Sequence, residues 1–109
     1  MIGRFQAQNY TDGDGNPTGG EVTGTGLYIG WQVGPLGRGD DRQEPNGAFV
    51  ETVIAAAKQR IEFYQTAGGG KFACRENALA ITKLDEALHW LNHRTQQREA
   101  RGVEGTHEA

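Results

Sequence analysis

The most regular hydrophobic pattern of the chain lies in its C-terminal third, between residues 72 and 107. Four aliphatic residues recur there at steps of three and four, the spacing that forms one stripe of an α-helix: Ile81, Leu84, Leu88 and Leu91. Asn77 lies one turn before the stripe, and Thr95 and Arg98 continue it. The pattern predicts a long helix that starts near residues 73–75 and stops at Gly102. An apolar centre with polar ends indicates packing in the middle and ligand contacts at both ends.

A second helical pattern precedes this one. Its apolar face repeats at helical spacing and consists of Val50, Val53, Ile54, Ala57, Ile61 and Tyr64. Asn46 is placed to cap the start of this helix, and the glycines at 68–70 end it. Because the glycine loop is short, the chain must turn back on itself, which predicts an antiparallel helical hairpin over residues 46–102.

The first part of the chain has the composition of strands and turns. Twelve of the seventeen glycines precede Ala48, and glycine is unfavourable inside helices. We expect a first strand over residues 3–10 and a turn region over residues 11–20. A longer strand is expected over residues 21–33, because apolar residues occupy every second position in its latter part. Glycines on one face of the longer strand indicate that something approaches its backbone closely.

These patterns predict an α+β fold with a small N-terminal antiparallel β-sheet followed by a long antiparallel two-helix hairpin. We expect one domain over residues 1–109, with the glycine-rich sheet and loop at 1–45, the hairpin at 46–102 and a C-terminal tail at 103–109. Hydrophobic residues make up only 36% of the chain, so self-association would help to bury the helix faces. The N-terminus lacks the apolar core of a signal peptide, and no run approaches ~18 apolar residues, so we expect a soluble intracellular protein without a membrane partner.

Charge narrows the range of ligands. The formal net charge of −3 argues against a general DNA or RNA binder, which needs a basic footprint. The end of the second helix nevertheless carries Arg94, Arg98 and Arg101 on one face, where they could clamp a phosphate or simply complement the negative end of the helix dipole. At the start of the same helix, Arg75 could bind an anion and the Asn77 amide could pair with an adenine edge.

Two further groups of residues have alternative interpretations. Phe63 and Phe72 flank the glycine loop and could either stack on a nucleobase or pack in the core. Arg38 and Arg42 lie among three acidic residues in the connection at 34–46, which is either a self-paired charge cluster or a functional loop.

The sequence contains few of the residue patterns that are typical of catalytic sites. The chain has no serine, its single cysteine is Cys74, and no Cys–His–acid arrangement is apparent, so a nucleophilic enzyme is not expected. His89 and His93 are one turn apart, but no Cys pair or HExxH motif accompanies them. We therefore expect no metal, no cofactor and no catalytic residue.

Three segments strongly resemble the Thoeris anti-defence protein 1 family of phages: GLYIGWQVGPLGR, EPNGAFVETVIAAAKQRIEFYQ and CRENALAITKLDEALHWLNHRTQQREARGVEGTH. The resemblance covers roughly residues 21–107. Within it, ENALAITKLDEALHWL is also similar to the wider helical-hairpin domain shared with phage anti-CBASS cyclic-nucleotide sponges. Asp85 stands where the family pattern has glutamate, which is a conservative departure.

The resemblance implies a binding protein rather than an enzyme. Members of this family sequester cyclic ADP-ribose isomers made by bacterial TIR-domain proteins without cleaving them, and some also bind cyclic di- or trinucleotides at separate sites. They form homo-oligomers, dimers that can build into hexamers, in the cytoplasm of the infected bacterial host. By similarity the ligand contacts fall on Arg42, Asn77, Arg94 and Arg98, with Phe63 or Phe72 stacking on the base.

A different class of function also fits the pattern. The helical hairpin could serve only to build a small oligomeric protein-interaction module with no nucleotide ligand. The arginines would then be a surface feature of the helix end.

Overall fold

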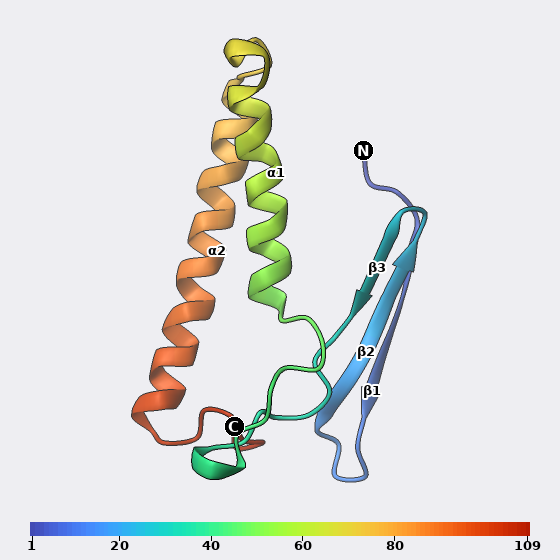
Figure 1. Ribbon diagram of the computed structural model, residues 1–109, viewed down its shortest axis with the longest axis vertical. Coiled ribbons are helices and arrows are strands. Elements are labelled where there is room, and N and C mark those ends of the chain that lie inside the picture. The colour runs from blue at the N-terminus through green and yellow to red at the C-terminus, as the bar shows by residue number, and fades with distance from the viewer. The chain divides into compact units, whose positions relative to one another are not determined.

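The computed structural model describes the whole chain, Met1–Ala109. It contains three strands, one short 3-10 turn and two helices (Figure 1). Their bounds are β1 (Phe5–Thr11), β2 (Pro17–Gly24), β3 (Leu27–Gly30), η1 (Gly39–Asp41), α1 (Val50–Gly70) and α2 (Arg75–Ala100). The predicted α+β class, a small antiparallel sheet followed by two helices, is confirmed. The residues group into two compact units: Met1–Phe49 with Glu99–Ala109, and Val50–Arg98.

The sheet of the first unit has the order β1-β2-β3, and both pairings are antiparallel. Asp12 organises the turn between β1 and β2, since its Oδ1 atom accepts hydrogen bonds from the backbone N–H groups of Asp14 (2.9 Å) and Asn16 (3.0 Å). Aspartate favours such turns because its short side chain can replace a backbone acceptor. The first strand therefore lies close to its predicted position, but the turn is shorter than predicted, because β2 begins at Pro17, within the region predicted as a turn.

The single strand predicted over residues 21–33 is wrong. The chain reverses at Thr25 and Gly26, and β3 pairs back onto β2 with Val22 opposite Ile29. Gly26 has a φ of +70°, the left-handed conformation that tight turns need and that glycine adopts without strain. The predicted close approach does occur, because a Cβ atom on Gly24 would lie 2.9 Å from the Arg4 carbonyl oxygen. The approaching group is the chain's own backbone.

The segment before α1 extends this unit. Ala48 forms a parallel bridge with Trp31, in which the Gln32 N–H donates to the Ala48 carbonyl (3.0 Å). The Asn46 side chain accepts from the Val33 N–H (2.8 Å) and donates to the Val33 carbonyl (3.2 Å). The prediction that Asn46 caps the first helix is wrong, because its amide is used in this pairing and α1 begins at Val50.

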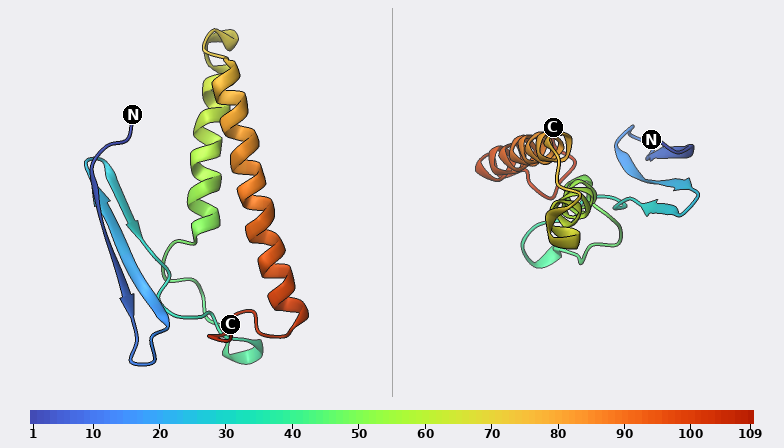
Figure 2. Two further views of the ribbon diagram at one scale, coloured as in Figure 1. Left: turned by 180° about the vertical axis from the view of Figure 1, so that it is seen from behind. Right: turned by 90° about the horizontal axis from the view of Figure 1, so that it is seen from above.

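The two helices form the second unit, in which α2 is uninterrupted and is followed by Gly102 at a φ of +75°, as predicted. Regular geometry in α1 ends at Thr66, since Ala67, Gly68 and Gly69 have non-helical backbone angles. α1 and α2 lie close together at the glycine loop and diverge away from it (Figure 2). Neither helix combines the length and apolar character that a membrane span requires.

No side chain in the chain is fully buried. On α2 the half-buried residues are Asn77, Ala80, Ile81, Leu84, Ala87, Leu88, Leu91, Thr95 and Arg98. The predicted stripe with its polar ends is thus confirmed. The face predicted for α1 is only partly correct: Val53, Ile54 and Ile61 are half-buried, whereas Val50, Ala57 and Tyr64 are exposed. A hydrophobic stripe that stays half-exposed on a splayed hairpin is a surface that a partner helix could cover.

Candidate ligand-binding site

Arg42 follows η1 in the first unit, and its guanidinium contacts the C-terminal tail. Its Nη1 atom donates to the Glu104 carboxylate at 2.7 Å and to the Gly37 carbonyl at 3.2 Å. The hydrogen bond that Arg42 donates to Glu104 raises the pKa of Arg42 above its ordinary value. The self-paired charge cluster considered for this loop is wrong, because the acidic partner of Arg42 lies 62 residues further along the chain.

Arg75 and Asn77 lie in the first turn of α2, where backbone N–H groups without a helical partner favour anions. Asn77 is half-buried, and its amide has no hydrogen-bond partner within the chain. Gln65 holds this end of the helix by accepting from the Cys74 N–H (3.0 Å) and donating to the Cys74 carbonyl (3.2 Å). An anchored helix start with an unused amide is suited to read the edge of a base.

The two candidate stacking residues both expose their rings. Phe63 is 48% exposed with the Arg60 guanidinium 5.3 Å from its ring centre, and Phe72 is 57% exposed with the Lys71 ammonium at 5.1 Å. Core packing, the alternative for these residues, is therefore not their environment in this chain. An exposed aromatic face beside a cation can accept a stacked base.

The arginines at the other end of α2 differ in their surroundings. Arg94 is exposed and has no partner within the chain, whereas Arg98 is half-buried, lies on the same stripe as Asn77 and is engaged in an interaction. Arg101 donates to the carbonyl of Ala109. Because α2 is one continuous helix with a rise of about 1.5 Å per residue, Asn77 and Arg94 are about 26 Å apart along its axis. One copy of α2 therefore does not bring its two polar ends together.

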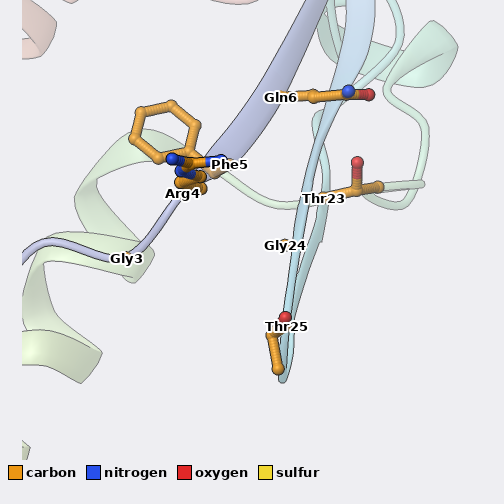
Figure 3. Close-up of a pocket in the computed structure, with 7 residues that line it drawn as sticks. All are labelled: Gly3, Arg4, Phe5, Gln6, Thr23, Gly24 and Thr25. Atoms are coloured by element: carbon orange, nitrogen blue, oxygen red, sulfur yellow. The ribbon is translucent and has the colours of Figure 1, made fainter.

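A shallow hollow in the first unit was not indicated by the sequence (Figure 3). Its lining is Gly3, Arg4, Phe5, Gln6, Thr23, Gly24 and Thr25, and it contains none of the predicted ligand residues. Arg4 and Phe5 lie together on β1 and the segment before it, while Thr23 and Thr25 belong to β2 and the turn after it (Figure 3). Its polar residues carry no spacing motif, so sequence patterns alone could not have revealed it.

The chain holds no group of three or more His, Cys, Asp or Glu side chains arranged to bind a metal ion. The groups that it offers to a ligand are arginines, one asparagine amide and exposed aromatic rings. The protein is thus a small α+β helical-hairpin protein. These arginine, amide and aromatic groups are of the types that bind anions and nucleobases.

The chain belongs to a family described as Acb2/Tad1, hairpin domain, whose model matches residues 25–96. It is 49% identical over 80 residues to a protein named Thoeris anti-defense 1 from Bacillus phage SBSphiJ7. That alignment covers 73% of this chain and 51% of the relative, so the chain spans about half the length of the curated relative. The resemblance seen in the sequence is confirmed. The family match includes every predicted ligand residue except Arg98, and it ends before the C-terminal tail.

Proposed function

We propose that this protein is a phage anti-defence protein that counteracts Thoeris immunity by binding cyclic ADP-ribose-type signalling nucleotides and withholding them without cleavage. The observation that carries the proposal is the distribution of ligand-type groups on α2, in a chain 49% identical to a Thoeris anti-defense 1 protein. Asn77 lies at one end of the helix, and Arg94 and Arg98 lie at the other.

The chemistry of a cyclic ADP-ribose matches these groups. Its pyrophosphate needs fixed cations, which Arg42, Arg94 and Arg98 supply. Its adenine needs an amide and a stacking surface, which Asn77 and an exposed phenylalanine ring supply. The same groups could hold cyclic di- or trinucleotides, which are a second ligand class for this proposal. No cofactor, nucleic acid or membrane is needed for binding of this kind.

The length of α2 makes self-association part of the proposal. A compact nucleotide cannot span the roughly 26 Å between Asn77 and Arg94 on one helix. Antiparallel pairing of two copies would place Asn77 of one copy beside the arginines of the other. The absence of any fully buried side chain in the single chain favours such pairing, because the half-exposed stripe of α2 would then be covered. We therefore propose a dimer or hexamer that works in the cytoplasm of the infected host cell.

The decisive experiment is recovery of the ligand. Purified protein is incubated with a cyclic ADP-ribose isomer, freed of unbound nucleotide, denatured and analysed by liquid chromatography with mass spectrometry. Sequestration predicts that the intact cyclic compound is released in stoichiometric amounts. Release of linear ADP-ribose would identify an enzyme and overturn the proposal.

One observation favours the alternative function, a helical-hairpin interaction module. Trp90 on α2 is 66% exposed, and its ring packs edge-on against His89 (5.6 Å) and His93 (6.0 Å). Exposed tryptophan is typical of protein–protein contact sites. A thermal-shift panel of cyclic ADP-ribose isomers and cyclic di- and trinucleotides separates the two, since a module without a nucleotide ligand would keep its Tm throughout.

A further inference from the structure

The guanidinium of Arg42 is held from one side only. Its two acceptors, the Glu104 carboxylate and the Gly37 carbonyl, both bind Nη1. Its Nε and Nη2 atoms make no hydrogen bond within the chain, and the side chain is 42% exposed. Those two nitrogens form one edge of the arginine fork, which can donate two parallel hydrogen bonds to a phosphate. Arg42 is therefore anchored with a bidentate edge open.

The anchor itself is built into the fold of the first unit. The Gly37 N–H donates to the Gly105 carbonyl at 2.8 Å, and the Arg38 guanidinium donates to the Gly102 carbonyl. Within the tail, the Thr106 N–H donates to the Val103 carbonyl at 3.1 Å. The residues of this tail turn, 102–106, are all half-buried. The Glu104 carboxylate is thus presented by an ordered turn and not by a loose chain end.

Gly105 shows how closely the tail turn fits the loop. Its φ is +79°, and a Cβ atom at this position would lie 2.4 Å from the Gly37 carbonyl oxygen and 3.0 Å from Nη1 of Arg42. Both the backbone angle and the contact require glycine. The loop that carries Arg42 and the tail that carries Glu104 therefore meet without space for any side chain between them.

We propose that Glu104 is a positioning residue that holds Arg42 ready to bind a phosphate of the ligand. The proposal rests on the proposed nucleotide binding, but Glu104 lies outside the residues that the family model matches. An arginine that is already immobilised loses less side-chain entropy when the ligand arrives. Because Glu104 occupies only Nη1, it restrains the guanidinium without covering the edge that faces the ligand.

The test is a double-mutant cycle measured by titration calorimetry with a cyclic ADP-ribose isomer. Glu104→Ala should weaken binding about tenfold, and Glu104→Gln should weaken it less, because a glutamine carbonyl can still accept from Arg42. In the Arg42→Ala background, Glu104→Ala should have almost no further effect. The matched control is Glu44→Gln, which makes the same charge change on an exposed residue of the same loop and should leave binding unchanged.

The outcomes separate the two proposals. If the unmodified protein binds no nucleotide, the proposed function fails and this inference fails with it. If the unmodified protein binds the nucleotide, the effect of Glu104→Ala is compared in the two backgrounds. If Glu104→Ala weakens binding as much in the Arg42→Ala background as in the unmodified protein, only the positioning role is wrong. Tighter binding by Glu104→Ala would also overturn that role, because it would mean that the carboxylate competes with the ligand. A thermal unfolding curve of each variant, with Glu104→Gln as the milder change, distinguishes loss of positioning from loss of the fold.

Discussion

Replacing Gln65 by alanine should destabilise the helical hairpin by about 1–2 kcal/mol. The side chain makes two hydrogen bonds to the backbone of Cys74, at 3.0 and 3.2 Å, and these join the end of α1 to the start of α2. Hydrogen bonds between neutral groups contribute about 0.5–1.5 kcal/mol each to stability. Because water can reach both of these bonds, we expect their combined contribution to lie near the middle of the range for two bonds. Alanine is also the better helix former, which returns a few tenths of a kcal/mol.

Urea unfolding followed by circular dichroism measures this effect. The matched control is Gln59→Ala, which makes the same change at an exposed position of the same helix where the side chain has no partner. Both variants must be compared at one protein concentration, because self-association would shift the apparent stability. The difference between their free energies of unfolding then isolates the two bonds to Cys74.

Equal free energies for the two variants would refute the reasoning. They would show that water replaces the Gln65 amide at no net cost, and that the glycine loop closes without this bridge. Since Phe72, Arg75 and Asn77 lie in or just after the segment that the bridge holds, the same variant tests how much order at this end of α2 the proposed binding site needs.

Three further perturbations follow from the structure. Arg94→Ala and Arg98→Ala should each weaken binding of a cyclic ADP-ribose isomer by about 1.5–3 kcal/mol if they bind phosphates, and unchanged titration calorimetry would remove them from the site. Gly105→Ala should destabilise the tail turn by about 1–2 kcal/mol because its φ is +79°, whereas Gly13→Ala, which has open space around it, should have little effect in the same thermal unfolding assay. The backbone hydrogen bond from Asn16 lowers the pKa of Asp12 below 3.8, so the stabilising effect of this carboxylate should be present above about pH 4 and be lost as the pH falls through the lowered pKa. An NMR titration of the Asp12 carboxyl carbon with a midpoint above 3.8 would contradict this.

The helices could be predicted from the sequence because the pattern that defines them is local. The stripe of Ile81, Leu84, Leu88 and Leu91 repeats within each turn, and it appears in the structure as the half-buried face of α2. The glycine stops after both helices are equally local, since glycine can adopt left-handed backbone angles without the steric cost that a Cβ atom imposes. The family resemblance rests largely on this same helical segment.

The sheet and the candidate site depended on hydrogen bonds between residues further apart than helical neighbours, such as those that pair β3 with β2 and Asn46 with Val33. A strand over residues 21–33 satisfies the alternation of side chains, yet the turn at Gly26 is decided by the pairing of β3 with β2. Asparagine is a residue type that commonly caps helices, but the amide of Asn46 pairs instead with the backbone N–H and carbonyl groups of Val33. In both cases a preference of the residues themselves was overridden by hydrogen bonds to a neighbouring segment of the chain.

The sequence by itself determined the fold class, the helical hairpin and the residue types that a ligand would meet. Only the tertiary structure decided that the Asn77 amide is unused, that Phe63 and Phe72 are exposed, and that Arg42 is anchored by Glu104. The physical reason is sequence separation. Helical periodicity is set by neighbours three and four residues apart, whereas Arg42 and Glu104 are 62 residues apart and meet only because a loop and the tail pack together.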